Sequence, residues 1–283
     1  MTFPAPIARA PLAGRVLYGV ILLLSLVVWL LPLMAVMLTS VRSLPEVSQG
    51  RYWGWPASWD LGNYVQVLTG TPMLRYLVNS LIVAVPAVVG TILVSAMAGT
   101  ALALYRLRLG LLLFAMFVAG NLVPFQILMI PVRDLMVRLG MYDSYGSLIL
   151  FHVSFQTGFC TLFMRNFVRR LPVELVEAAR LAGASELRIF WTIVLPLVRP
   201  AMAALAVLVF TFVWNDYFWA LVLVQSDAVR PVTIGLTALR GQWVASWPLV
   251  SAGSIIAALP PVVVFFRMQN HFISGLTGGV RRR

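Results

Sequence analysis

The groups that could perform covalent or metal chemistry are few in this sequence. All 21 basic residues are arginine, so the chain supplies neither the lysine of a GxxxxGK[ST] phosphate loop nor a lysine that could form a Schiff base. One cysteine, Cys160, and two histidines, His152 and His271, provide no disulfide framework and no zinc cluster. We therefore expect no catalytic residue, no metal site and no cofactor in this chain, and Cys160 should pack as a small apolar residue.

An isolated acid, Asp216, is the one charged residue between Pro200 and Ser226. An acid within an apolar segment by default faces the interior of a helix bundle or water. Because a helix rises 1.5 Å per residue, Asp216 also lies roughly 24 Å from Pro200, which places it near a membrane surface. Two interpretations stay open, an interfacial or structural acid and a residue that faces an internal lumen.

Apolar helices must position these groups, because the composition is that of a membrane protein. Of the 283 residues, 61% are hydrophobic and 11% are charged, with a mean hydropathy of +0.92, whereas roughly a quarter of the residues of a soluble protein are charged. The formal charge of +12 would suggest nucleic acid in a soluble protein, but in a membrane chain the arginines mark the flanks of the spans. We therefore expect a lipid bilayer around the chain and no nucleic-acid partner.

Six charge-poor segments are each long enough to cross a bilayer, which takes about 20 apolar residues. The stretch between Arg15 and Arg42 has 26 uncharged residues, and the stretch between Arg75 and Arg106 has 30. The fold class is therefore predicted as all-α, a single polytopic membrane domain over 1–283. Its six transmembrane helices are expected at roughly 16–41, 77–105, 109–132, 144–164, 200–226 and 247–267.

The arginine distribution predicts the orientation of such a chain. With both termini on one side, that side carries 14 arginines and the other side carries 7. Positive charge is retained on the cytoplasmic side, so both termini are expected in the cytoplasm. The first apolar segment exceeds the length of a signal-peptide core, about 7 to 15 residues, and is expected to be an uncleaved helix. Residues 165–199 then form one long cytoplasmic loop.

This loop has the pattern of two short helices. Pro172 suits a first helical position, Glu174 and Glu177 lie early, where the helix dipole favours anions, and Arg180 lies late, where it favours cations. Gly183 is expected to end this helix.

A second helix should follow directly. Ser185 is a plausible N-cap, and apolar residues recur after it at helical spacing until two prolines break the run. These apolar residues are Leu187, Phe190, Trp191, Val194 and Leu195. The pattern predicts a stiff amphipathic bracket, and a helix pair lying on the membrane surface is the alternative.

Several short stretches of this loop match a known pattern together. Glu177-Ala178-Ala179, Gly183-Ala184-Ser185, Phe190, Ile193 and Leu195-Pro196 resemble the EAA loop of binding-protein-dependent ABC importer permeases. The resemblance implies a type I ABC importer permease fold, in which this loop is a coupling helix held in a cleft of a separate ATPase subunit. It places the coupling contacts at Glu177, Ala178, Ala179, Gly183, Ala184, Ser185 and Phe190. The chain has Ala182 where the carbohydrate branch commonly has aspartate, which weakens one contact.

Two further stretches narrow the resemblance, which extends from Tyr76 to the end of the chain, to carbohydrate importers. Trp214-Asn215-Asp216-Tyr217, followed by Phe218-Trp219-Ala220-Leu221, is similar to the WNE/WND segment of their permeases. Gly275-Leu276-Thr277-Gly278-Gly279-Val280 is similar to the tail of the smaller subunit of the maltose-type pair. The resemblance suggests a substrate path along Trp214, Asn215, Asp216, Tyr217 and Trp219, and a cytoplasmic tail contact at Gly275, Leu276, Thr277 and Gly278.

The side chains around Asp216 suit a sugar. Aromatic rings stack on the apolar faces of sugars, while asparagine and aspartate take up hydroxyl hydrogen bonds. An aromatic belt at the membrane boundary has the same composition, so both interpretations of this segment stay open.

The function implied by the resemblance is transport, not catalysis. The chain is expected to move a sugar or oligosaccharide by alternating access through the cytoplasmic membrane of a prokaryote. The implied partners are a second permease subunit that completes a heterodimer, two copies of a P-loop ATPase that carry ATP and magnesium, and an extracytoplasmic solute-binding protein. Permeases for other solutes share the loop, so a non-sugar solute is an alternative; a stand-alone secondary transporter is another, although no internal repeat supports it.

Overall fold

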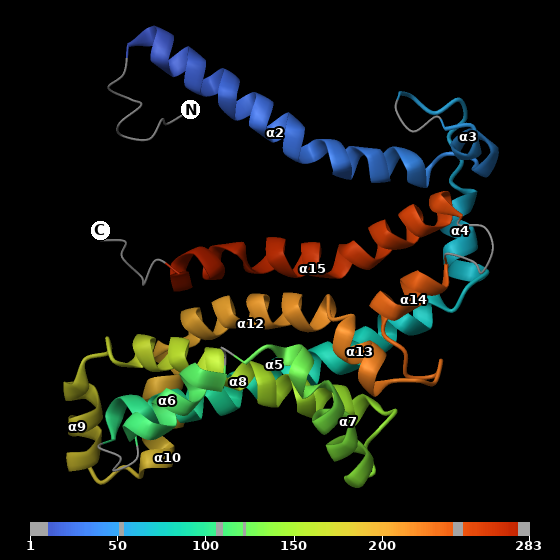
Figure 1. Cartoon of the computed structure of the whole chain (residues 1–283). Coiled ribbons are helices and arrows are strands. Elements are labelled where there is room, and N and C mark those ends of the chain that lie inside the picture. The colour runs from blue at the N-terminus through green and yellow to red at the C-terminus, as the bar shows by residue number, and fades with distance from the viewer. Residues whose placement is uncertain (1–10, 51–53, 106–109, 121–122, 240–245, 277–283) are drawn as a thin grey trace. The chain divides into compact units, whose positions relative to one another are not determined.

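Helices and the turns that join them make up the described part of this chain. The computed structural model describes residues 11–50, 54–105, 110–120, 123–239 and 246–276, and within these ranges it contains helices and connecting turns but no strand (Figure 1). The all-α fold class is confirmed. The chain divides into two compact units, one with residues up to 72 and 236–256, the other with 73–235 and the residues from 257 onward.

The first unit is built around a polar loop that follows the long helix α2 (Leu12–Ser40). Two short helices, α3 (Leu44–Ser48) and α4 (Gly62–Thr69), flank this loop. Arg42 is 1% exposed and donates from Nη1 to Glu46 Oε1 at 2.9 Å and from Nη2 to the Gly54 carbonyl at 2.5 Å. Asn63 Nδ2 donates to the carbonyls of Ser40 and Arg42. Because separating a buried ion pair leaves an uncompensated charge, the Arg42–Glu46 pair and its neighbouring contacts hold the loop in place.

The second unit has a core of three helices. They are α5 (Met73–Leu104), α8 (Tyr145–Val168) and α12 (Arg199–Trp214), of which α5 and α8 form the most extensive pair. At Gly99 an added Cβ would lie 2.8 Å from Met164 Cβ and 2.9 Å from the Arg165 nitrogen. Small residues at such positions let membrane helices approach closely, and here glycine permits the α5–α8 contact.

Shorter elements lie at both ends of this core. At one end are α9 (Val173–Leu181) and α10 (Glu186–Ile189), and at the other are α7 (Met129–Arg138) and α13 (Phe218–Leu223) (Figure 1). The chain continues from α10 through the π-helical turn η2 (Phe190–Val194) and α11 (Leu195–Leu197) into α12. The remaining helices are α6 (Gly110–Gly120), the 3-10 turn η1 (Phe125–Leu128), α14 (Val232–Ala238) and α15 (Trp247–Leu276).

Four helices within the described ranges are long and apolar enough to cross a membrane. They are Leu12–Ser40, Met73–Leu104, Tyr145–Val168 and Trp247–Gln269. A fifth candidate results if Glu186–Leu197 and Arg199–Trp214, bent by 75° relative to each other, count as one span. The segments predicted at 16–41, 77–105, 144–164 and 247–267 fall on the first four helices, whereas the total of six spans stays a prediction.

Two predicted segments are interrupted. Residues 109–132 are not one helix: α6 ends at Gly120, and η1 and α7 follow Pro124. Proline lacks an amide hydrogen and its ring clashes with the preceding turn, so it starts a new helical segment rather than continuing the old one. Residues 200–226 are likewise divided, because α12 ends at Trp214 and α13 begins at Phe218.

Candidate functional site

The predicted bracket at 165–199 is present as two helices joined by a tight turn. Pro172, which the sequence suggested as the first helical residue, directly precedes α9, so the helix begins one residue later than predicted, at Val173. Gly183 has a φ of +78°, a left-handed conformation that few residues other than glycine adopt. Ser185 Oγ accepts the amide hydrogen bond of Arg188 at 3.3 Å, so the predicted N-cap is confirmed.

The residues predicted to couple to an ATPase lie along this bracket. Glu177 and Ala178 are exposed on α9 and Ala179 is half-buried, while Ala184 and Ser185 follow the turn. Phe190 is buried at the start of η2 and packs edge-on against Trp191, with ring centroids 5.3 Å apart. Phe190 therefore anchors the bracket, and the α9 residues face outward.

Large apolar side chains are exposed beside these residues. Leu181 is 91% exposed, Leu187 60% and Trp191 48%. Because polar side chains usually cover a helix that faces water, a group of exposed apolar side chains indicates a contact surface. The bracket thus combines exposed apolar groups with the small side chains of Ala178 and Gly183.

A cluster of three side chains, here called the bracket clamp, ties both bracket helices to the end of α5. Arg180 donates from Nε to Glu186 Oε1 at 2.8 Å and from Nη2 to Oε2 at 3.2 Å. Tyr105, the residue after α5, donates its hydroxyl to Glu186 Oε2 at 2.5 Å, and the Arg180 guanidinium lies 5.6 Å from the centroid of its ring. These hydrogen bonds, first from Arg180 and then from Tyr105, lower the pKa of Glu186. Burial and the bond to Glu186 raise the pKa of Tyr105.

Asp216 lies in the break between α12 and α13, and this position determines which groups its carboxylate contacts. Its Oδ1 accepts from the Trp219 amide at 3.2 Å and its Oδ2 from the Ala220 amide at 3.0 Å, so the carboxylate caps α13. His152 Nε2 lies 3.5 Å from the same Oδ2. Asp216 therefore has a structural role and also lines the cavity described next, which agrees with both interpretations of the sequence.

A cavity of about 270 Å³ lies beside Asp216. Seven aromatic residues line it: Phe125, Phe151, Phe155, Phe212, Tyr217, Phe218 and Trp219. The other lining residues in the described part of the chain are polar: His152, Gln156, Asn215 and Asp216.

Four of the five residues in the predicted substrate path line this cavity, and the fifth does not. Trp214 is 2% exposed, and its indole nitrogen donates to the Ala257 carbonyl at 3.0 Å, which fixes α12 to α15. The cavity also contains phenylalanines from η1 and α8 and the polar His152 and Gln156, none of which the sequence reasoning selected. Their separation along the chain gave no signal of this proximity.

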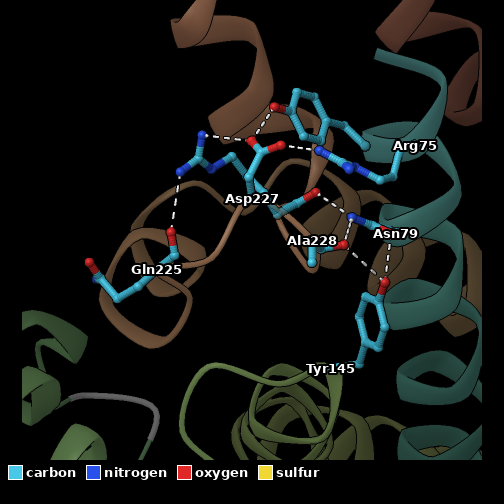
Figure 2. Close-up of polar contacts among 8 residues, drawn as sticks. Arg75, Asn79, Tyr145, Gln225, Asp227 and Ala228 are labelled. Carbon is cyan, nitrogen blue, oxygen red and sulfur yellow. Dashed lines mark hydrogen bonds and ion pairs between the residues drawn. The ribbon is translucent and has the colours of Figure 1, made fainter. Parts of the chain in front are cut away.

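A second polar cluster was also missed by the sequence reasoning (Figure 2). In this Asp227 cluster, the aspartate carboxylate accepts hydrogen bonds from Arg75, from the Tyr76 hydroxyl and, at 3.1 Å, from Arg230. Asn79 Nδ2 donates to the carbonyls of Ala228 and Arg230, both at 2.9 Å. The start of α5 therefore holds the segment between α13 and α14.

The start of α8 holds the same segment from another side. The Tyr145 hydroxyl donates to Asn79 Oδ1 at 2.7 Å, and Asp143 Oδ1 accepts from the amides of Gln225 and Ser226 at 2.8 and 2.9 Å. Burial tends to raise the pKa of Asp143, but the amide hydrogen bonds outweigh it and the pKa is lowered. The segment 225–230 is thus fixed by contacts with two helices of the core.

The predicted tail contact falls at the edge of the described part of the chain. Gly275 and Leu276 are the last residues of α15. Thr277 and Gly278 lie outside the described residues.

A bundle of apolar helices with an ordered bracket at one end and a cavity among its helices defines a multi-pass membrane transport component. The chain belongs to the family of binding-protein-dependent transport system inner membrane components, whose model matches residues 7–278. Members of this family are ABC importer permeases of the inner membrane, and the predicted resemblance to this family is thereby confirmed.

Several proteins that are similar to this chain are named as permeases for sugars. The arabinooligosaccharides transport system permease protein of Halalkalibacterium halodurans is 33% identical over 228 residues, which cover 80% of this chain and 81% of that protein. The sulfoquinovosyl glycerol transport system permease protein of Agrobacterium fabrum is 27% identical and covers 94% of both chains. A crystal structure of a bacterial ABC transporter that imports the acidic polysaccharide alginate matches with a TM-score of 0.81 and 24% identity, over 96% of this chain and 100% of that one.

Proposed function

We propose that this chain is the permease subunit of an ATP-driven importer that moves a sugar or oligosaccharide into the cell by alternating access. It pairs with a second permease subunit, and two copies of a P-loop ATPase bind ATP and magnesium beneath them. An extracytoplasmic binding protein delivers the sugar. The names of the relatives support sugar as the cargo, and the family supports the ABC importer class.

The observation that carries this proposal is the exposed apolar surface of the bracket, with Leu181 at 91% exposure. In our proposal Glu177, Ala178, Ala179, Gly183, Ala184 and Ser185 dock in a cleft of the ATPase, and Phe190 holds the bracket to the core. Shifting a two-state equilibrium from 1:99 to 99:1 requires about 5.5 kcal/mol of differential interaction. The glycine turn, the Ser185 cap and the bracket clamp supply the stiffness that transmits such a difference.

The proposed topology has six spans with both termini in the cytoplasm. The excess of arginines on that side supports it. The interrupted segments 109–132 and 200–226 are the third and fifth spans, since broken helices are tolerated in a membrane where protein surrounds them. In this topology Gly275, Leu276, Thr277 and Gly278 lie on the cytoplasmic side and contact the ATPase.

Copurification tests the assembly. The tagged chain, extracted in mild detergent, should retain a P-loop ATPase and a distinct permease in stoichiometric amounts. A solitary or self-associated chain would favour a stand-alone secondary transporter. Recovery of the assembly together with ATP-driven uptake of a solute other than a sugar would favour a permease for that solute.

Two substitutions at Gly183 test the bracket. Proline cannot adopt the observed φ of +78°, whereas asparagine adopts this left-handed conformation more readily than most residues. Gly183→Pro should leave the chain inserted but abolish uptake, and the matched control Gly183→Asn should retain it. Normal uptake by the proline variant would contradict the docking role.

The proposed substrate path includes Asn215, Asp216, Tyr217 and Trp219 at the cavity, with Trp214 supporting them from α12. Asn215 and Tyr217 are exposed to it, and amide and ring groups suit a sugar. Asn215→Ala should raise the apparent KM for uptake. If both Asn215→Ala and Asp216→Asn leave the uptake rate and the apparent affinity unchanged, the path does not run here.

A further inference from the structure

The electrical charge of the cargo is the property that the fold alone leaves open, since the similar transporter of known structure imports an acidic polysaccharide. The cavity beside Asp216 bears on this question through the charges in its lining. Among the described residues that line it, Asp216 supplies the one carboxylate and none is arginine. With no lysine in the sequence, His152 is the remaining residue of the lining that could carry a positive charge.

The Asp216 carboxylate is already committed to other groups. Two backbone amides donate to it, and His152 Nε2 lies 3.5 Å away. The His152 side chain is 5% exposed and packs edge-on against Phe151, with ring centroids 5.4 Å apart. His152 therefore faces Asp216 and is not presented to a ligand as a free cation.

The side chains left to meet a ligand are neutral. Gln156 offers an amide donor and acceptor, and Tyr217, which is 44% exposed, offers a hydroxyl and a ring face. Asn215 Nδ2 donates one hydrogen bond to the Thr211 carbonyl at 2.8 Å, so Asn215 offers its Oδ1 and its second N–H. Uncharged sugars need this combination of amides for hydroxyl groups and aromatic faces for C–H surfaces. A uronate would place a second carboxylate near Asp216 in surroundings of low polarity, where an unpaired anion is strongly disfavoured.

We propose that this cavity is a subsite for an uncharged glycoside and excludes acidic sugars, with Gln156 and Asn215 as the hydrogen-bonding residues. This inference rests on the proposed function, because it assumes that the cavity opens to the path of the cargo. At about 270 Å³ the cavity lies just below the usual range of ligand pockets, about 300–1,000 Å³. It holds part of an oligosaccharide, and the second permease subunit holds the rest.

Saturation-transfer NMR on the assembled importer in nanodiscs, without the binding protein, tests the subsite directly. The probes are a mixture of arabinotriose and maltotriose as neutral ligands, and trigalacturonate as the acidic ligand. Signals should come from a neutral trisaccharide and not from trigalacturonate. Gln156→Arg places a cation in the cavity and should raise the ratio of acidic to neutral signal about tenfold, the equivalent of about 1.4 kcal/mol.

Gln66→Arg is the matched control, because Gln66 is exposed on α4 and does not line the cavity. It should leave the ratio unchanged. Saturation of trigalacturonate by the unmodified importer, or an equal response of both arginine variants, would overturn the inference. The proposed function would fail in a different way, by the absence of a copurifying ATPase or of ATP-driven sugar uptake, so the two failures are distinguishable.

Discussion

Replacing Glu186 by glutamine should loosen the bracket from α5 while leaving both bracket helices folded. The variant keeps the shape of the side chain but removes the charge that Arg180 and Tyr105 contact. An exposed arginine–carboxylate pair contributes about 0.2–1 kcal/mol, and the tyrosine hydrogen bond adds about 1 kcal/mol. The loss is therefore at most about 1–2 kcal/mol, since the glutamine oxygen can still accept one hydrogen bond, and it changes the ratio of attached to detached bracket by a factor of at most about 30.

Two measurements on the importer in nanodiscs report this change. The distance between spin labels on α9 and on the last turn of α5 should broaden toward longer values in Glu186→Gln. The amount of sugar taken up per ATP hydrolysed should fall, because a detached bracket moves without moving α5. Tyr105→Phe removes one of the three hydrogen bonds to Glu186 and should have a smaller effect.

Glu174→Gln is the control for this prediction, since Glu174 is exposed on α9, the other bracket helix, and forms no ion pair with any residue that the structure describes. It should match the unmodified importer in both measurements. An unchanged distance distribution and an unchanged uptake per ATP in Glu186→Gln would refute the reasoning. Loss of the ATPase from purified Glu186→Gln would assign Glu186 to the docking surface instead.

Three further predictions concern packing, the Asp227 cluster and pH. Gly99→Leu should lower the free energy of unfolding of the purified complex by about 1–3 kcal/mol, because its Cβ would lie 2.8 Å from Met164 Cβ. The control Gly120→Leu has open space around its Cβ and should leave this free energy unchanged. Asp227→Asn should increase amide hydrogen exchange in residues 225–231, since the carboxylate binds Arg75, Tyr76 and Arg230. The control is Asp134→Asn, at an exposed position. Equal exchange rates in the two variants would contradict the prediction. Folding lowers the pKa of Glu186. The contribution of Glu186 to stability is therefore complete above its unfolded pKa, about 4.3, and is lost as the pH falls through the lower folded pKa. The spin-label distances should stay constant from pH 7 to about 5 and lengthen only below about pH 4.

Local patterns in the sequence predicted the bracket well, because its structure depends on neighbours along the chain. Gly183 and Ser185 act within one turn of where they stand, through a left-handed φ and an N-cap. The two long helices α5 and α8 could also be predicted from the sequence, since a charge-free run of more than 20 residues has few other structures available in a bilayer.

The clusters that fix these helices to one another could not be predicted in this way. Arg75 and Asp227 are separated by 152 positions, and Tyr105 and Glu186 by 81. Charged and tyrosine residues are common where a helix leaves the membrane, so the type of each residue does not indicate which distant residue it contacts. Residues 109–132 were misjudged for a different reason: hydropathy shows that a segment is apolar enough to cross a membrane, but Pro124 decides that it is not one helix.

Asp216 links the helix structure to the cavity, because its structural role determines which groups a ligand in the cavity can contact. A break in an apolar helix exposes amide groups that must find acceptors, and the carboxylate supplies them for Trp219 and Ala220. Leucine at this position would leave both amides without that acceptor, which is a sufficient reason for an acid in an apolar segment. Since its oxygens already accept these bonds, we propose that a ligand in the cavity is bound by the amides of Asn215 and Gln156 rather than by the charge. In this proposal, the acid that first suggested a sugar site shapes that site, and its neutral neighbours contact the cargo.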